Sequence, residues 1–272
     1  KYPPGDANCQ CDKINDCICC AGKRMSDREV DLERRFGGII RLYGVKKFRL
    51  IQNCHVCVVG IGGVGSWVVE SLVRHGVGKI TLIDMDHIVE SNINRQIHAL
   101  DSTDGESKIK AMKDRIMDIN PTCHVDCIDD FLEESNIESH ISSKFDFIID
   151  AIDQSSVKTS LAEYCQSKHL SLIMVRGAGG RVDPARIKIA DLSKTFGDPL
   201  LSNIRKHFNK KNKLSKSEYE IPTIFSDEPI IKSDACETDQ SGGGLSCDGY
   251  GSSLNITATM AFYVVAYIFS KI

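Results

Sequence analysis

The sequence lacks an uninterrupted apolar stretch long enough to cross a membrane. Its longest apolar tract, residues 260–269, follows the polar residues Asn255, Thr257 and Thr259. This tract is shorter than the roughly 18 apolar residues that a membrane span needs. An apolar signal segment is also missing. We therefore predict no membrane span and interpret the tract as part of a buried C-terminal helix.

The chain also has little excess of charge of either sign. It carries 34 Lys and Arg against 37 Asp and Glu, for a formal net charge of −3. Overall charge therefore gives no preference for nucleic acid, and such contacts would need a local basic patch. The 272 residues contain no visible internal repeat and are 42% hydrophobic, which is typical of a globular protein.

The twelve cysteines do not indicate a secreted disulfide scaffold. The chain is long and has no signal segment, so reduced thiols in an intracellular protein are expected. We expect a cytoplasmic location, with mitochondrial association as the alternative. Residues 1–24 show no hydrophobic period, and we predict a leader that is disordered or non-native, with Met25 as the natural start. A small zinc or copper site is the alternative, because this leader holds Cys9, Cys11, Cys17, Cys19 and Cys20.

Strand-like and helix-like segments alternate between residues 55 and 180. Residues 30–53 precede them as helical segments that we expect to break at Gly37-Gly38 and at Gly44. The alternation predicts an α/β, Rossmann-like fold with a mostly parallel sheet and helices on both faces. The predicted strands are 55–60, 79–86, 123–130, 145–153 and 170–180, and the predicted helices are 66–76, 107–120 and 155–169.

The remaining residues, 181–272, are less regular. We predict a strand pair in 181–192, a basic helix-then-loop segment in 201–220, a long glycine-rich connection in 233–253 and the terminal helix.

A glycine-rich turn follows the first predicted strand, in CVVGIGGVGSWVVE at residues 57–70. Gly60, Gly62 and Gly65 have the G-x-G-x-x-G spacing, which combines a tight turn, a close approach of phosphate to the backbone and close helix–strand packing. The following helix N-terminus offers unpaired N–H groups to an anion. Asp84 ends the next strand, where a carboxylate can accept hydrogen bonds from a ribose hydroxyl. These features suit NAD and ATP equally.

Three charged residues beyond the turn favour ATP. Arg95 and Lys108 can neutralise a triphosphate whose α-phosphorus is attacked, whereas a diphosphate at a helix terminus has less need of them. Asp153 follows the fourth strand and is a suitable Mg²⁺ ligand. Taken singly, Arg95 and Lys108 could be solvated helix charges and Asp153 could cap the helix at Ser155. No acid or base for hydride transfer accompanies the turn, which disfavours a dehydrogenase.

This set of motifs resembles the ubiquitin-activating-enzyme superfamily, which includes the sulfur-carrier adenylyltransferases of molybdopterin and thiamin synthesis. The matching motifs are GxGGxGS at 60–66, the D-x-D of 84–86, S-N-x-x-R-Q at 91–96, Lys108 and D-x-x-D at 150–153. Several segments are similar in sequence to the tRNA threonylcarbamoyladenosine dehydratases: RRFGGIIRLYG, NINRQIHAL, IIDAID and GAGGRVDP. The likeness extends over nearly the whole chain after Met25.

The resemblance implies ATP and Mg²⁺ as cofactors, with Arg95, Lys108 and Asp153 in catalytic roles and Asp153 also on Mg²⁺. It implies adenylation of the threonyl carboxylate of the modified adenosine beside the anticodon of tRNA, followed by ring closure. We accordingly expect one adenylating domain in residues 25–272, with an ATP-binding core in 25–180 and a C-terminal part in 181–272 that includes a Gly-rich loop at 241–251. The residues implied in ATP binding are Gly60, Gly62, Gly63, Gly65, Asp84, Asp86, Asn92 and Gln96.

The chain departs from the wider superfamily in two respects. The two Cys-x-x-Cys pairs that hold structural zinc are missing from its second half, so no structural zinc is expected. The superfamily takes an arginine from a partner subunit, but Gly38 occupies that position here, and Arg35 or Arg41 is the candidate replacement. A homodimer is implied by the superfamily.

A basic segment at residues 205–216 is the candidate tRNA contact. It has no intervening acid and consists of Arg205, Lys206, Lys210, Lys211, Lys213 and Lys216, with Arg176, Arg181 and Arg186 as extensions. A solvated loop is the alternative. Two other functions stay open: adenylation of the C-terminal glycine of a ubiquitin-like protein, with Cys236 or Cys247 as a thioester thiol, and a nucleotide-binding adaptor for a sulfur-transfer system with a cysteine desulfurase.

Overall fold

The computed structural model describes residues 30–212, 218–231 and 250–272. In this part of the chain seven strands form one sheet in the order β3-β2-β1-β4-β5-β7-β6. All neighbouring strands are parallel except β6 and β7, which are antiparallel. The strands are β1 His55–Val59, β2 Lys79–Ile83, β3 His124–Ile128, β4 Phe147–Asp150, β5 Leu172–Val175, β6 Ile187–Asp191 and β7 Pro222–Ser226.

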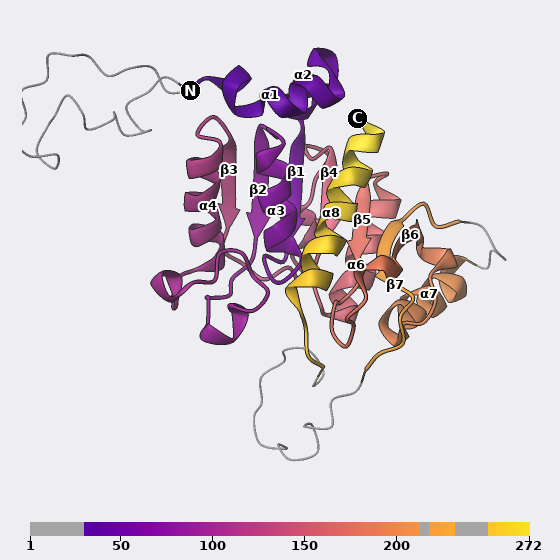
Figure 1. Ribbon diagram of the computed structural model, residues 1–272. Helices are drawn as coiled ribbons and strands as arrows, with labels where there is room; N and C mark the ends of the chain where they lie inside the picture. The colour runs from indigo at the N-terminus through magenta and orange to yellow at the C-terminus, as the bar shows by residue number, and fades with distance from the viewer. Residues whose placement is uncertain (1–29, 213–217, 232–249) are drawn as a thin grey trace, which may run out of the picture.

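Helices cover both faces of the sheet, as Figure 1 shows. On β1, Val56 and Val58 belong to one hydrophobic core, while Cys57 and Val59 belong to the other, because successive strand side chains point to opposite faces. The first core holds residues of α3 (Gly65–Arg74), α4 (Lys108–Ile119) and α8 (Leu254–Lys271), and the second holds residues of α5 (Ile137–His140), α6 (Ser155–Ser167) and α7 (Pro199–Asn212). The predicted α/β fold is confirmed.

Helix α8 is the expected C-terminal helix. It is long and apolar enough to cross a membrane by length and composition alone, and half of its apolar window is buried inside the protein. Ile256, Met260 and Val264 are fully buried in the first core. This burial against α3 and the sheet explains the apolar tract as core packing.

The two N-terminal helices lie at the edge of the sheet where the strands begin, at the top of Figure 1. Helix α1 (Leu32–Tyr43) is continuous through Gly37 and Gly38, so the predicted break there is wrong. Asp31 caps this helix and Phe36 is buried, and a helix stabilised in this way tolerates two glycines. The predicted break at Gly44 is confirmed: its φ of 82° ends α1, and α2 (Val45–Asn53) follows.

The strand pair predicted in 181–192 is also wrong. This segment forms a short 3₁₀ helix, Pro184–Arg186, and the single strand β6. The partner of β6 is β7, which sequence reasoning missed. Residue Pro222 opens β7, where proline costs no ladder hydrogen bond. Most of the predicted Gly-rich loop at 241–251 lies outside the described residues.

Candidate nucleotide-binding site

The glycine turn lies at the edge of the sheet where the parallel strands end. Gly60 follows β1 with a φ of 88°, and a Cβ there would lie 2.9 Å from the carbonyl oxygen of Ala151. A Cβ on Gly65 would lie 1.8 Å from the carbonyl oxygen of Gly60, so α3 packs too closely on the turn for any side chain. By contrast, a Cβ on Gly62 would meet nothing within 4 Å. The backbone at Gly62 is therefore open to a ligand.

Asp84 holds the turn from the neighbouring strand. Its Oδ2 accepts the backbone N–H of Ile61 at 2.6 Å, and its Oδ1 accepts that of Asp86 at 2.8 Å. Burial raises the pKa of Asp84, and this rise is opposed by Lys108 and by the two backbone donors. Asp84 thus fixes the shape of the glycine turn, and each of its oxygens keeps a second lone pair.

Lys108 opens α4 at the same edge. Its side chain is buried, and its Nζ donates to Oδ2 of Asp86 at 2.6 Å. The side chain of Asp86 is half-exposed, at 52%. The pair therefore places a buried ammonium beside an acid that faces solvent, directly after β2.

Arg95 lies against the glycine turn. A Cβ on Gly63 would come within 3.5 Å of the Arg95 side chain and 3.1 Å of Thr257 on α8. The Arg95 guanidinium donates to the backbone oxygen of Ser91 at 2.7 Å and to Oδ1 of Asn94 at 2.9 Å. The indole N–H of Trp67 donates to the backbone oxygen of Arg95 at 3.0 Å. These contacts join the turn, the S-N-x-x-R-Q box and the start of α8.

Two further residues of that box are buried beside it. Asn92 accepts the N–H of Val89 at 3.2 Å through Oδ1, whereas Oε1 of Gln96 has no hydrogen-bond partner in the described part of the chain. Ser66, the last residue of the glycine motif, has an Oγ in the same condition. Buried polar atoms of this kind are normally satisfied. Their presence on the motif residues is consistent with a site that is completed by a ligand.

Asp153 lies just beyond the end of β4 and is exposed. A single exposed carboxylate fits Mg²⁺ that arrives on a nucleotide, because Mg²⁺ takes one or two carboxylates together with phosphate oxygens. Among the described residues no cluster of three or more His, Cys, Asp or Glu forms a dedicated metal cage.

Sequence reasoning missed Lys158, which is fully buried on α6. Its Nζ lies 2.9 Å from Oδ1 of Asp150 and donates to the backbone oxygen of Val175 at 2.8 Å. Burial raises the pKa of Asp150, and Lys158 opposes that rise. The pair ties the ends of β4 and β5 together just before Asp153. The only signal in the sequence was its position: Lys158 lies in the first turn of the predicted helix that follows the acidic end of the fourth predicted strand.

Neither candidate arginine lies at this site in its own chain. Arg35 donates to the backbone oxygens of Asp118 and Ile119 at the C-terminal end of α4, which is the opposite edge of the sheet from Lys108. Arg41 is exposed on the same helix as Arg35. Either residue could serve a glycine turn only in a second copy of the chain.

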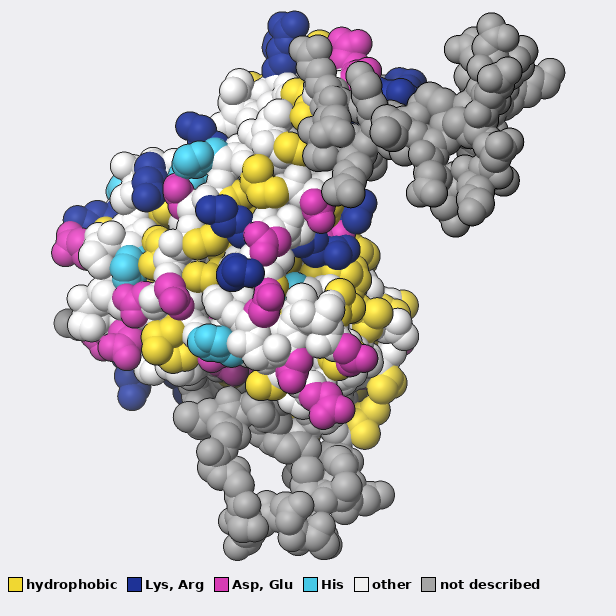
Figure 2. All heavy atoms as spheres, turned by 90° about the vertical axis from the view of Figure 1, so that its left-hand side faces the viewer, with side chains coloured by type: hydrophobic (Ala, Val, Ile, Leu, Met, Phe, Trp, Pro, Cys, Tyr) yellow, Lys and Arg dark blue, Asp and Glu magenta, His cyan; other side chains and the backbone are white. Residues whose placement is uncertain are grey.

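The basic segment begins on α7, where Lys206 and Lys210 are exposed. Arg205 is turned partly inward and donates to Oγ1 of Thr195 at 2.6 Å. The side chain of Lys211, and all of Lys213 and Lys216, lie outside the described residues. The face seen in Figure 2, on the side of α4 and β3, mixes acidic and basic side chains and offers no continuous basic area.

We predicted that Arg176, Arg181 and Arg186 extend the basic segment. This prediction is wrong for Arg176 and Arg181, which are buried. Arg176 and Arg181 are 5% and 2% exposed, so neither belongs to a basic patch on the surface. Arg176 forms an ion pair with Asp198. Arg186 is paired with Asp227.

All five cysteines of the described residues have a raised pKa, which is unsuited to nucleophilic chemistry; four of them are buried and Cys127 is exposed. Cys54, Cys123 and Cys165 are buried, and burial raises the pKa of each to about 12. Cys57 is buried likewise, so the Cys54 and Cys57 pair consists of buried, protonated thiols at the end of α2 and in β1. Cys236, Cys247 and the leader cysteines lie outside the described residues.

Comparison with known proteins identifies relatives along most of the chain. A model of the ThiF family matches residues 37–223. The chain is 43% identical over 244 residues to the tRNA threonylcarbamoyladenosine dehydratase of Haemophilus influenzae, covering 88% of this chain and 94% of that protein. The crystal structure of the E. coli tRNA N6-threonylcarbamoyladenosine dehydratase in complex with ATP has a TM-score of 0.79 and 39% identity, covering 88% of this chain and 93% of that one. The complex of the E. coli enzyme with AMP has the same TM-score and 40% identity, covering 88% and 94%.

Proposed function

The chain belongs to the ThiF family, and from this premise we propose that it is an ATP-dependent dehydratase that acts on N6-threonylcarbamoyladenosine in tRNA. One observation carries the proposal: the open backbone at Gly62 lies at the same sheet edge as Arg95 and the buried Lys108. The similar E. coli dehydratase has been crystallised with ATP and with AMP, the nucleotides that an adenylating enzyme binds and releases.

In the first step the threonyl carboxylate attacks the α-phosphorus of ATP. A bond forms between a carboxylate oxygen and phosphorus, the bond to the β-phosphate oxygen breaks, and pyrophosphate leaves. Arg95 and Lys108 neutralise the charge on the phosphates as it shifts towards the leaving group. Asp86 orients Lys108 through its 2.6 Å contact. The product is an acyl-adenylate.

Asp153, exposed just beyond the end of β4, is the residue that would hold Mg²⁺. The metal supplies charge neutralisation and orientation of the phosphate oxygens when it is bound. The fixed end of β4, held by the Asp150–Lys158 pair, positions Asp153 for this role.

In the second step the carbamoyl group of the same nucleoside attacks the activated carbonyl. A five-membered ring closes, the bond to the adenylate oxygen breaks and AMP departs, so that the oxygen lost from the substrate leaves in AMP and the carbamoyl group releases one N–H proton to solvent. The nucleophile is tethered to its target, which gives it a high effective concentration. No enzyme thiol is required, in agreement with the raised thiol pKa of each cysteine in the described residues.

A homodimer would place Arg35 or Arg41 of one copy at the glycine turn of the other. This proposal rests on the position of α1 at the far edge of its own sheet.

We also propose that Lys206 and Lys210 contact tRNA phosphates. Asp198, whose side chain accepts the N–H of Leu201 at 2.8 Å, pairs with Arg176 beside the end of β5. The start of α7 therefore lies close to the nucleotide edge.

The second candidate function is adenylation of the C-terminal glycine of a ubiquitin-like or sulfur-carrier protein. The same glycine turn, Arg95 and Lys108 would serve it, which is why the motif alone does not decide between the two. We also propose a cytoplasmic location and a link to a cysteine desulfurase system.

The deciding experiment incubates the protein with ATP, Mg²⁺ and tRNA that carries the open threonylcarbamoyl nucleoside. Mass spectrometry of the digested nucleosides should show an ATP-dependent loss of one water from that nucleoside. Unchanged nucleoside, together with pyrophosphate exchange only when a ubiquitin-like protein is added, would move the assignment to the second candidate.

A further inference from the structure

Arg181 carries a buried guanidinium that is only partly satisfied. The residue is 2% exposed, and its Nη1 donates to the backbone oxygen of Gly179 at 2.6 Å. Its Nε and Nη2 are buried and have no hydrogen-bond partner in residues 30–212, 218–231 and 250–272. Burial lowers the pKa of Arg181 to about 10, so the side chain is still charged at neutral pH. A buried, unpaired cation is costly and calls for an explanation.

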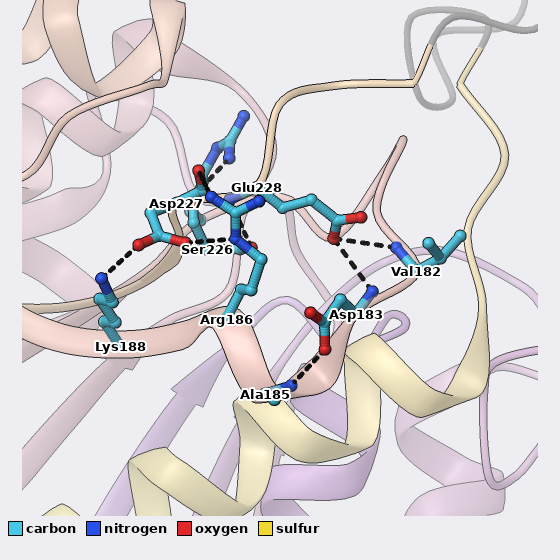
Figure 3. A network of polar contacts seen from close by, with 9 residues as sticks. Val182, Asp183, Ala185, Arg186, Lys188, Ser226, Asp227 and Glu228 are labelled. Carbon is cyan, nitrogen blue, oxygen red and sulfur yellow. Dashed lines mark hydrogen bonds and ion pairs between the residues drawn. The ribbon is translucent and has the colours of Figure 1, made fainter.

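The neighbouring charges do not satisfy this side chain. Glu228 is the acid whose charge acts on it, yet the Oε2 of Glu228 accepts the N–H groups of Val182 and Asp183 at 3.1 and 3.0 Å. Figure 3 shows this carboxylate turned towards those two backbone groups. Arg186 nearby donates to Asp227 through Nε and Nη2. Arg181 therefore has no carboxylate partner among the described residues, whereas Arg176 and Arg186 each have one.

The two free nitrogens are the pair that binds a carboxylate. Elsewhere in this protein Arg115 uses the same atoms, Nε and Nη2, to donate to the two oxygens of Glu70 at 2.6 and 2.9 Å. Parallel N–H bonds of this kind match the two coplanar oxygens of a carboxylate. The unused pair on Arg181 is therefore complementary to a carboxylate, and a phosphate shares this chemistry.

Arg181 follows a loop that is connected to the nucleotide edge by a chain of contacts. The N–H of Gly180 donates to the backbone oxygen of Gly251 at 2.8 Å. The next residue along, Ser252, accepts the side-chain amide of Asn94 at 3.0 Å. Asn94 in turn holds the guanidinium of Arg95. The loop after β5 and the phosphate-binding residues thus form one connected group.

We propose that Nε and Nη2 of Arg181 bind the threonyl carboxylate of the modified nucleoside and orient it before its attack on ATP. This inference rests on the proposed function and adds a substrate-binding residue to it. Arg95 and Lys108 act on the phosphates, whereas Arg181 acts on the group that is to be activated. The unfavourable burial of its charge in the free protein is offset when the substrate carboxylate arrives.

The test compares Arg181→Gln and Arg181→Lys with the control Lys188→Gln, which removes a half-exposed cation paired with Asp227. Three quantities are measured on the full protein: kcat/KM for ring closure in modified tRNA, the Kd for ATP from Trp67 fluorescence, and the Tm. For Arg181→Gln we expect kcat/KM to fall at least about 100-fold. The Kd for ATP and for the same tRNA without the threonylcarbamoyl group should stay at the wild-type value. The Tm should stay the same or rise, because an unpaired buried charge is removed.

Arg181→Lys should recover only a small part of the lost activity, because an ammonium cannot bind both oxygens in one plane. Wild-type kcat/KM in Arg181→Gln would overturn the role of Arg181. A Kd for ATP that weakens as much as kcat/KM falls would assign the side chain to a nucleotide phosphate. A clear fall in Tm would make it a structural residue. A wild-type protein that closes no ring would overturn the proposed function, and this substrate with it.

Discussion

Nζ of Lys108 lies 2.6 Å from Oδ2 of Asp86, joining the first residue of α4 to the segment that follows β2. The lysine is buried and the acid is half-exposed, so in the proposed function a triphosphate would approach the ammonium from the side of Asp86. This arrangement holds the cation in place before the nucleotide arrives, which is the condition for electrostatic stabilisation of a transition state.

Replacement of Lys108 by Met should lower kcat for ring closure by about 10³-fold or more, because the charge on the leaving pyrophosphate is no longer neutralised. The matched control is Lys110→Met, two residues further along α4, where the side chain is exposed and forms ion pairs with Glu106 and Asp114. Single-turnover assays on both variants measure the effect. Equal losses in the two variants would contradict the assigned role of Lys108.

Two glycines of the turn should respond differently to alanine. Gly65→Ala places a Cβ 1.8 Å from a backbone oxygen and should cost at least about 3 kcal/mol of unfolding free energy, since no flexible side chain can move away. Gly62→Ala meets no atom within 4 Å and should fold with the wild-type Tm, yet raise the Kd for ATP about tenfold or more because the new methyl group occupies the phosphate approach. Thermal melts and Trp67 fluorescence titrations separate the two effects. Tight ATP binding in Gly62→Ala would exclude that backbone from the site.

Glu70 should stabilise the fold above its titration range and not below it. Burial favours a raised pKa, but hydrogen bonds from Arg115 and Arg74 outweigh burial and hold the pKa of Glu70 below its ordinary value of 4.5. A depressed carboxyl pKa stabilises the native state above the unfolded pKa, and this stability is lost as pH falls through the folded value.

Glu70→Gln should therefore cost about 2 kcal/mol at pH 7 and progressively less below pH 4.5, because Arg115 joins α3 to α4 only through the charged form. Denaturant melts from pH 7 to pH 3 measure this difference. The same cost at every pH would mean that packing, and not charge, accounts for the effect.

His98 should make the fold sensitive to mild acid. Its ring is buried, both nitrogens lack a hydrogen-bond partner in the described part of the chain, and burial with Lys108 and Arg115 lowers its pKa from 6.5 to about 4. As the pH falls, His98 therefore binds a proton near pH 6.5 in the unfolded chain but only near pH 4 in the folded chain. Stability due to this residue is complete above pH 6.5 and is lost as pH falls towards 4, by up to about 3 kcal/mol.

The measurement is the slope of unfolding free energy against pH between 6.5 and 4. His98→Leu should flatten this slope whatever its effect on stability at pH 7. His124→Gln serves as the control because the His124 side chain is 66% exposed. An unchanged slope in His98→Leu would show that other groups cause the acid sensitivity.

Much of the fold followed from periodicity in the sequence. The buried runs around Val56, Ile80 and Ile149 alternate with amphipathic helices, and only a parallel sheet covered on both faces buries all of them. The prediction failed at Gly37-Gly38, where tertiary packing and the Asp31 cap outweighed the low helix propensity of glycine. It also failed at β7, a five-residue strand that begins with proline and differs little from a loop in sequence.

The sequence by itself determined the parallel core and the place of the glycine turn after its first strand, because spacing and apolar pattern are local properties of the chain. The roles of Arg95, Lys108 and Asp153 stay predictions that their shared edge supports. Only the tertiary structure decided which charges are buried, which are paired and which stay unsatisfied. Lys158, Glu70 and Arg181 look alike as charged residues in the sequence, yet the first two have partners in the folded chain and the buried Nε and Nη2 of Arg181 have none among the described residues. Burial and pairing depend on groups far apart along the chain, and the energy of a charge in a folded protein is set by those neighbours.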